Sequence, residues 1–161
     1  MKFSINTIAT DITKLESLHK AVIDSSSVIY LFRLHLIDAL GQVLRLTAPP
    51  AVFEETALSG LPIRKIESKN FAGLLPDAQV LELARQEGCA LIADDKKMLQ
   101  KAAENGLDYF NTLMMVLLLY RRGMLDRRKT ESKLKALYGF AHYAKSIRDY
   151  GRMVLEAMEP N

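Results

Sequence analysis

The chain of 161 residues has a single cysteine, no tryptophan, and few glycines and prolines. One cysteine, Cys89, excludes an internal disulfide framework and a multi-cysteine zinc site, and favours a reducing, cytoplasmic setting. Eight glycines and five prolines without a period exclude collagen-like and low-complexity architectures. The longest apolar run, residues 113–120, falls well short of the roughly 20 residues that span a bilayer. Residues 3–8 alternate polar and apolar side chains, which predicts no secretory signal. We therefore expect a soluble protein with no membrane partner.

The rest of the composition is that of an ordinary globular protein. Hydrophobic residues make up 49% and charged residues 25%, and this balance excludes disorder over most of the chain. The length is typical of one domain. We predict a single domain over residues 1–161, with an N-terminal extension over residues 1–19 and a basic helical tail over residues 124–161.

Charge is unevenly distributed along the chain. From Arg121 to the C-terminus there are ten basic residues and five acidic residues, whereas acidic residues are in excess before that point. A basic segment favours a polyanionic partner, because binding releases condensed counterions. The alternative interpretation of the same segment is a set of solvated helix faces.

Short apolar segments alternate with longer helical patterns. This alternation predicts an α/β fold, in which a mostly parallel sheet carries helices on both faces and is followed by further helices. The expected strands are residues 20–23, 43–47, 63–66, 89–93 and 107–110. The expected helices are residues 26–40, a helix beginning at Pro50, and residues 78–86, 96–104, 112–122, 130–137 and 147–158.

Acidic residues lie at or near the ends of these predicted elements. Asp24 follows the first strand directly, and Asp94 and Asp95 follow the strand at residues 89–93. Asp77 begins the helix that leads into that strand, and Glu55 lies early in the helix after the second strand. Because ligands of an open parallel sheet bind outside the carboxyl ends of the strands, we expect these carboxylates to gather at one edge.

Carboxylates that lie close together repel one another unless a cation compensates their charge. Oxygen ligands alone favour Mg²⁺ or Mn²⁺. Such an ion lowers the pKa of a bound water and screens a phosphodiester, so hydrolysis becomes feasible without a serine, cysteine or histidine nucleophile. The alternative interpretation is structural, because acids at helix N-termini also act as caps and favour the helix dipole.

Four segments, in order, resemble the successive motifs of PIN-domain proteins. They are residues 22–26 (VIDSS), 50–55 (PAVFEE), 77–84 (DAQVLELA) and 91–95 (LIADD). The resemblance covers residues 20–123, and the helical tail is similar to that of the prokaryotic, toxin-like PIN proteins. It implies a three-layer α/β/α fold with a central, mostly parallel sheet, and the activity of a Mg²⁺- or Mn²⁺-dependent endoribonuclease.

The resemblance also implies roles for individual residues. The implied catalytic residues are Asp24, Glu55 (rather than Glu54), Asp77 and Asp95; the metal ligands are Asp24, Asp77, Asp94 and Asp95; and the substrate contacts are Ser25 and Ser26. Apart from the resemblance, Lys96 is expected to contact the phosphate of the substrate because it is next to the acids; the alternative is a solvated lysine at a helix N-terminus. Of Asp94 and Asp95, Asp95 fits the fourth motif slightly better. Many relatives carry threonine or serine where this chain has Ala93.

The function expected from these features is RNA phosphodiester hydrolysis, with the chain acting as the toxin of a toxin–antitoxin pair. RNA would be the substrate, a cognate antitoxin protein would block the acidic groove, and the toxin would form a homodimer. One alternative is a PIN fold that binds RNA or protein without catalysis. Another is a phosphoacceptor receiver domain, which expects paired acids after the first strand, whereas the pair here comes late.

Overall fold

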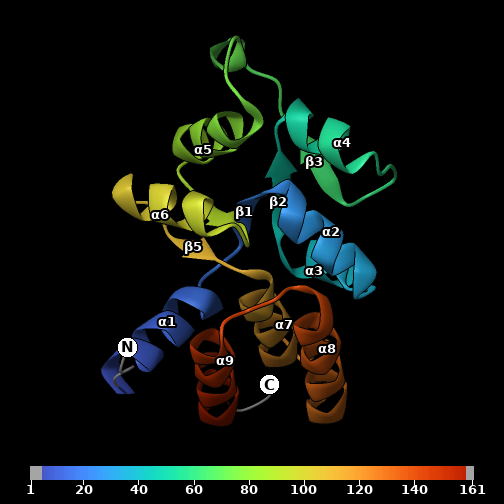
Figure 1. Cartoon of the computed structure of the whole chain (residues 1–161), viewed down its shortest axis with the longest axis vertical. Helices are drawn as coiled ribbons and strands as arrows, with labels where there is room; N and C mark the ends of the chain where they lie inside the picture. The colour runs from blue at the N-terminus through green and yellow to red at the C-terminus, as the bar shows by residue number, and fades with distance from the viewer. Residues whose placement is uncertain (1–4, 159–161) are drawn as a thin grey trace. The chain divides into compact units, whose positions relative to one another are not determined.

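The computed structural model describes residues 5–158, which fall into two compact units. We call His19–Thr112 the sheet unit and the remainder, described over residues 5–18 and 113–158, the helical unit. Figure 1 shows the elements of both units along the chain. Residues 1–4 and 159–161 lie outside the described part, and with them the start of the alternating N-terminal segment. The single domain expected over residues 1–161 stays a prediction.

The sheet unit is built on five parallel strands in the order β3-β2-β1-β4-β5. The strands are β1 (Lys20–Ile23), β2 (Arg45–Ala48), β3 (Ile63–Lys65), β4 (Ala90–Ile92) and β5 (Tyr109–Phe110). Consecutive residues of the central strands, Val22 and Ile23 in β1 and Leu91 and Ile92 in β4, are fully buried. Both faces of these strands are therefore covered, as parallel sheets require. The predicted parallel sheet is confirmed.

The helices of the sheet unit cover both faces of this sheet. They are α2 (Ser25–Arg33), α3 (Ile37–Val43), α4 (Pro50–Thr56), a short 3₁₀ turn η1 (Lys69–Phe71), α5 (Pro76–Glu87) and α6 (Lys96–Glu104).

Two lysines show on which faces α4 and α5 lie. Lys65 lies 5.0 Å from the centre of the Phe53 ring of α4, and Lys20 lies 2.9 Å from the Glu87 carboxylate of α5. The strand register places these two lysines on opposite faces of the sheet. Right-handed crossovers then put α2 and α3 beside α4, and α6 beside α5. The predicted three-layer α/β/α fold is confirmed.

The single helix predicted over residues 26–40 is wrong. The chain leaves the helix after Arg33, and His35 takes a left-handed conformation with φ of 57° before α3 begins. Leu34 and Leu36 on either side are buried, while His35 is exposed. Burial of two leucines across a turn therefore outweighs the local helical pattern. The second helix, α3, then continues past Leu40 to Val43 and includes Gly41.

The helical unit contains α1 (Ile5–Glu16), α8 (Arg127–Phe140), α9 (Lys145–Ala157) and all but the first residue of α7 (Thr112–Arg121). Arg121 pairs with the Glu16 carboxylate at 2.7 Å, and Arg122 donates to the carbonyls of Glu16 and Leu18. These bonds hold the end of α1 against the end of α7. The predicted helical C-terminus is confirmed. No helix within residues 5–158 combines the length and the apolar character needed to cross a bilayer.

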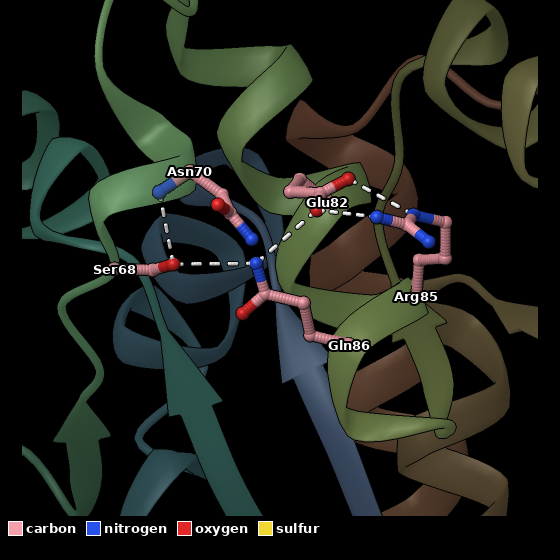
Figure 2. A network of polar contacts seen from close by, with 5 residues as sticks. All are labelled: Ser68, Asn70, Glu82, Arg85 and Gln86. Carbon is pink, nitrogen blue, oxygen red and sulfur yellow. Dashed lines mark hydrogen bonds and ion pairs between the residues drawn. The ribbon is translucent and has the colours of Figure 1, made fainter.

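A polar network ties the η1 turn to α5 (Figure 2). The Ser68 hydroxyl accepts from the Asn70 backbone N–H and from the Gln86 amide, and that amide also donates to Glu82. Arg85 donates two hydrogen bonds, of 2.6 and 3.0 Å, to the same Glu82 carboxylate. Each exposed contact is weak alone. Together they attach the segment before Pro76 to the helix that carries Asp77.

The close approach of α3 to the start of β3 generates a stability prediction. A Cβ at Gly41 would lie 2.5 Å from Pro62 Cβ and 2.6 Å from its Cγ. Alanine is the better helix former by about 1 kcal/mol. We nevertheless expect Gly41→Ala to lower the free energy of unfolding by about 1–3 kcal/mol in urea titrations, because the rigid proline ring must move.

The matched control is Gly139→Ala in α8, where an added Cβ would meet no atom within 4 Å. That variant should gain about 0.5–1 kcal/mol. Equal stabilisation by both substitutions would contradict the packing argument.

Candidate functional site

The candidate site is built around Asp24, where β1 ends and α2 begins. Its backbone N–H donates to the carbonyl of Ile92 in the neighbouring strand β4 at 2.9 Å, and its carbonyl accepts from Val28 in the first turn of α2. Asp24 is the N-cap residue of α2, and only 6% of it is exposed. Sheet and helix together therefore hold a nearly buried carboxylate at the carboxyl edge of the central strand.

The pKa of Asp24 reports which other acids lie near it. Burial first, and then repulsion by Asp77, Glu55 and Asp95, raise this pKa from 3.8 to about 6, against the lowering effect of the Ser25 backbone N–H. The four acids come from three different helices and the end of β1. The fold therefore brings Glu55, Asp77 and Asp95 within electrostatic reach of Asp24, and the catalytic roles of all four remain predictions.

A hydrogen bond distinguishes Glu55 from its neighbour in sequence. The Ser25 hydroxyl donates to Glu55 Oε1 at 2.8 Å, which joins the start of α2 to the end of α4. Ser25 is buried, and both Glu54 and Glu55 are exposed, so the hydrogen bond and not burial separates the two glutamates. Ser25 thus orients Glu55 beside Asp24. The expected contact of Ser25 with substrate remains a prediction.

Asp94 and Asp95 face different surroundings. Both oxygens of the Asp94 carboxylate are used: Oδ2 accepts from the hydroxyls of Ser27 and Thr112, each at 2.5 Å, and Oδ1 accepts from the Thr112 backbone N–H at 3.1 Å. Asp95 instead caps α6 by accepting from the Lys97 backbone N–H. Its charge also contributes to the raised pKa of Asp24. Asp94 therefore ties β4 to the starts of α2 and α7, and Asp95 belongs to the acidic cluster.

Sequence reasoning missed Ser27 and Thr112. Both are fully buried, and they supply the hydroxyl donors that Ala93 lacks. Ser27 is the third residue of a serine run after the first strand, so that run was the available signal. Nothing local marks Thr112 as a partner of a carboxylate 18 positions earlier.

The other two residues expected to contact substrate lie beside the same loops. The Ser26 hydroxyl accepts from the Asp94 backbone N–H at 3.4 Å. Lys96 is exposed at the first residue of α6. Contact of either side chain with substrate remains a prediction.

The donor chemistry of the cluster fits a hard dication. Within residues 5–158, no three carboxylate, imidazole or thiolate side chains lie close enough together to hold one metal ion. Mg²⁺, however, binds through one or two carboxylates and retains several waters. The cluster offers oxygen ligands alone, and repulsion by the other carboxylates contributes to the raised pKa of Asp24. A dication would relieve that repulsion.

Comparisons with known proteins include a likeness to a solved structure. No protein-family model matches the chain, and no curated protein matches it. A PilT N-terminus domain protein from the hyperthermophilic archaeon Sulfolobus solfataricus P2 is similar, with 21% identity and a TM-score of 0.46. The match covers 62% of this chain and 93% of that chain. A likeness of this size assigns neither residues nor activity to this chain.

The raised pKa of Asp24 generates a prediction about stability and pH. The protonated form of Asp24 is the one the fold favours, so its contribution is fully present below about pH 4 and is lost as the pH rises through about 6. Asparagine cannot ionise and avoids this loss. We expect Asp24→Asn, in EDTA, to exceed the wild type in free energy of unfolding by about 2–3 kcal/mol at pH 8.

The difference should close as the pH falls toward 4, as measured by urea unfolding at several pH values. Asp38→Asn is the control, because Asp38 is an exposed aspartate in the first turn of α3. A difference that stays constant between pH 4 and 8 would show that Asp24 does not titrate near 6.

Proposed function

We propose that this chain is a Mg²⁺- or Mn²⁺-dependent ribonuclease that hydrolyses RNA phosphodiester bonds. The observation that carries the proposal is the nearly buried Asp24 carboxylate, which is repelled by Glu55, Asp77 and Asp95 at the carboxyl edge of a parallel sheet. Ligands bind at this edge in open α/β sheets. Four carboxylates kept together there against their own repulsion favour a cation-dependent reaction over a purely structural role.

The proposal gives the residues of the cluster different roles. Asp24, with Asp77 or Asp95 as a second direct ligand, would hold the ion, and the remaining carboxylate would act through the waters that the ion retains. A bound ion would supply an activated water and screen the phosphate charge. Glu55, oriented by the Ser25 hydroxyl, accepts a proton from the attacking water. Asp94 is a positioning residue, because its carboxylate is bonded to Ser27 and Thr112.

Protonation of Asp24 sets the working pH in this scheme. With a pKa of about 6, the carboxyl group carries a proton in mildly acidic solution. A ligand carboxylate must be deprotonated to bind a metal, so metal affinity should fall as the pH drops below about 6.

The test is cleavage of single-stranded RNA with Mg²⁺ or Mn²⁺ present, and again with EDTA. We expect EDTA to abolish cleavage. Asp24→Asn and Glu55→Gln should each lower the rate by about a hundredfold or more, since each removes a charged group at the reacting phosphate. Glu54→Gln removes the same charge from the adjacent, exposed position and should retain wild-type activity. Equal rates for the wild type and Asp24→Asn would refute the nuclease proposal.

A groove in the helical unit supports RNA as the substrate. Residues of α8 and α9 line a groove of about 590 Å³, with five basic and three acidic side chains. Arg148 lies 6.0 Å from the centre of the Tyr138 ring, and the Tyr143 ring meets Tyr138 edge-on. An aromatic ring beside basic side chains stacks bases of single-stranded nucleic acid while the cations meet its phosphates.

Ion pairs within the groove leave part of its positive charge available. Arg127 pairs with Glu131 and Lys145 pairs with Asp149. Within the described residues, Lys135 has no carboxylate partner. The groove therefore offers both a stacking surface and a cation for a phosphate.

We predict that Tyr138→Leu weakens binding of single-stranded RNA about tenfold, because one base loses its stacking partner. Fluorescence anisotropy in the non-cleaving Asp24→Asn background measures this affinity. Tyr109→Leu is the control, because Tyr109 is an exposed aromatic residue of β5 outside the groove. Unchanged affinity for the Tyr138 variant would remove the groove from the RNA-binding surface.

We also propose the finer assignment that the nuclease is the toxin of a toxin–antitoxin pair, active in the cytoplasm. The order of the four sequence motifs supports it. An antitoxin protein would cover the acidic edge. A homodimer is supported by Ile29 and Phe32, exposed apolar residues three positions apart on one face of α2. Sedimentation of the purified protein as a monomer would refute the dimer, and growth unaffected by expression of the active nuclease would refute the toxin.

A further inference from the structure

A second charged cavity lies at the amino ends of the strands, away from the carboxyl edge that carries the acidic cluster. It has a volume of about 400 Å³, and its lining includes Lys20, Arg45, Thr47, Arg64 and Glu87. Lys20 begins β1 and Arg45 begins β2. The cavity belongs entirely to the sheet unit.

The strand register explains why these side chains meet. Lys20 is paired with Arg45, and Thr47 is paired with Arg64 in the parallel ladder. Arg45 and Thr47 are two residues apart in β2, so their side chains point to the same face. All four side chains therefore leave the sheet on one face, the face to which Glu87 of α5 is tied by Lys20.

The charge left over in this cavity is positive. Lys20 and Glu87 neutralise each other at 2.9 Å. Arg45 and Arg64 are exposed, and within the described residues neither is paired with a carboxylate. A guanidinium group presents a planar fork of donors that matches the oxygens of a phosphate, so two unpaired arginines on one wall favour a phosphate ligand.

Thr47 provides an independent observation. Only 8% of the residue is exposed, and among the described side chains of residues 8–158 its hydroxyl is the one polar atom that is buried without a hydrogen-bond partner. A buried hydroxyl that lacks a partner costs free energy, and such groups in native proteins mark a missing ligand or a functional role. The orphan hydroxyl belongs to the same cavity wall as the two arginines.

We propose that this cavity binds a phosphate group, with Arg45 and Arg64 donating to its oxygens and the Thr47 hydroxyl donating to a third. The phosphate comes either from a free phosphate or mononucleotide or from the backbone of a bound RNA. This inference goes beyond the nuclease proposal and shares no residue with the acidic cluster. It stands or fails independently of that proposal.

Isothermal titration calorimetry of the full chain tests the proposal. The Asp24→Asn variant in EDTA is titrated with inorganic phosphate, with adenosine 5′-monophosphate and with a short single-stranded RNA, at constant ionic strength set with chloride. Binding of the first two identifies a site for free phosphate. Because the groove of α8 and α9 is also proposed to bind RNA, binding of RNA alone identifies a backbone contact in this cavity only when Arg64→Gln weakens it, and RNA binding that Arg64→Gln leaves unchanged overturns the proposal. No binding of any of the three overturns the proposal. Because cleavage is absent from this assay, failure of the nuclease proposal leaves the result unaffected.

Arg64→Gln should weaken binding about tenfold or more, because it removes a charged pair of hydrogen bonds. Lys65→Gln is the matched control: it removes the same charge from the next residue, which points to the opposite face and lies over Phe53. Equal weakening by the two variants would mean that the chain attracts phosphate through its overall charge, and would overturn the site.

Thr47→Val separates a ligand contact from a structural role. Valine keeps the shape of threonine and removes the orphan hydroxyl, so the melting temperature of the free protein should rise. The same variant should bind phosphate several-fold more weakly, because the third donor is gone. A raised melting temperature with unchanged phosphate affinity would overturn the assignment of Thr47 to the site.

Discussion

Repulsion between carboxylates at the carboxyl edge of the sheet is the constraint that shapes the sheet unit. Asp24 is nearly buried beside Glu55, Asp77 and Asp95, and burial first, then repulsion by these acids, raises its pKa to about 6. The fold offsets this repulsion through helix N-termini. Asp24 and Asp95 are N-cap residues of α2 and α6, and Asp77 lies in the first turn of α5. These three acids therefore meet the positive ends of helix dipoles, which parallel βα alternation presents at this edge, whereas Glu55 lies near the end of α4.

Asp94 is a further acid at the same edge, and hydrogen bonds turn its side chain away from the cluster. It follows β4 immediately, so its charge would add to the cluster if its side chain turned toward Asp24. Hydroxyls of Ser27 and Thr112 hold it in another direction, and the Thr112 backbone N–H adds a third bond. The two adjacent aspartates thus have different roles: Asp94 accepts hydrogen bonds from Ser27 and Thr112, and Asp95 caps α6.

The two ends of the sheet differ in charge. The residues that follow the strands decide the charge at one end, and the strand register decides which basic side chains share a face at the other. At the carboxyl ends, acids follow β1 and β4 closely. At the amino ends, the register places Lys20, Arg45 and Arg64 on one face, whereas Lys65 lies on the other face over Phe53. One small sheet can therefore offer a cation site and an anion site whose residues do not overlap.

Local pattern in the sequence was enough to identify most elements and to find the acids. The helix Lys96–Glu104 lies where its pattern predicts, and β4 lies within the buried run predicted from Cys89 to Ala93. Both predictions succeed because apolar periodicity and helix caps depend only on residues a few positions apart. The same logic failed at His35. There two leucines find burial only through a left-handed turn, and a local pattern contains no information about what they pack against.

By itself, then, the sequence determined the α/β class, the approximate elements and the set of acids near strand ends, since these depend on neighbours a few positions apart. Tertiary structure alone decided the strand order, the separate environments of Asp94 and Asp95, the hydroxyl partners Ser27 and Thr112, and the cavity beneath Arg45 and Arg64. Those features join residues tens of positions apart, and strand pairing brings them together only when the whole sheet forms.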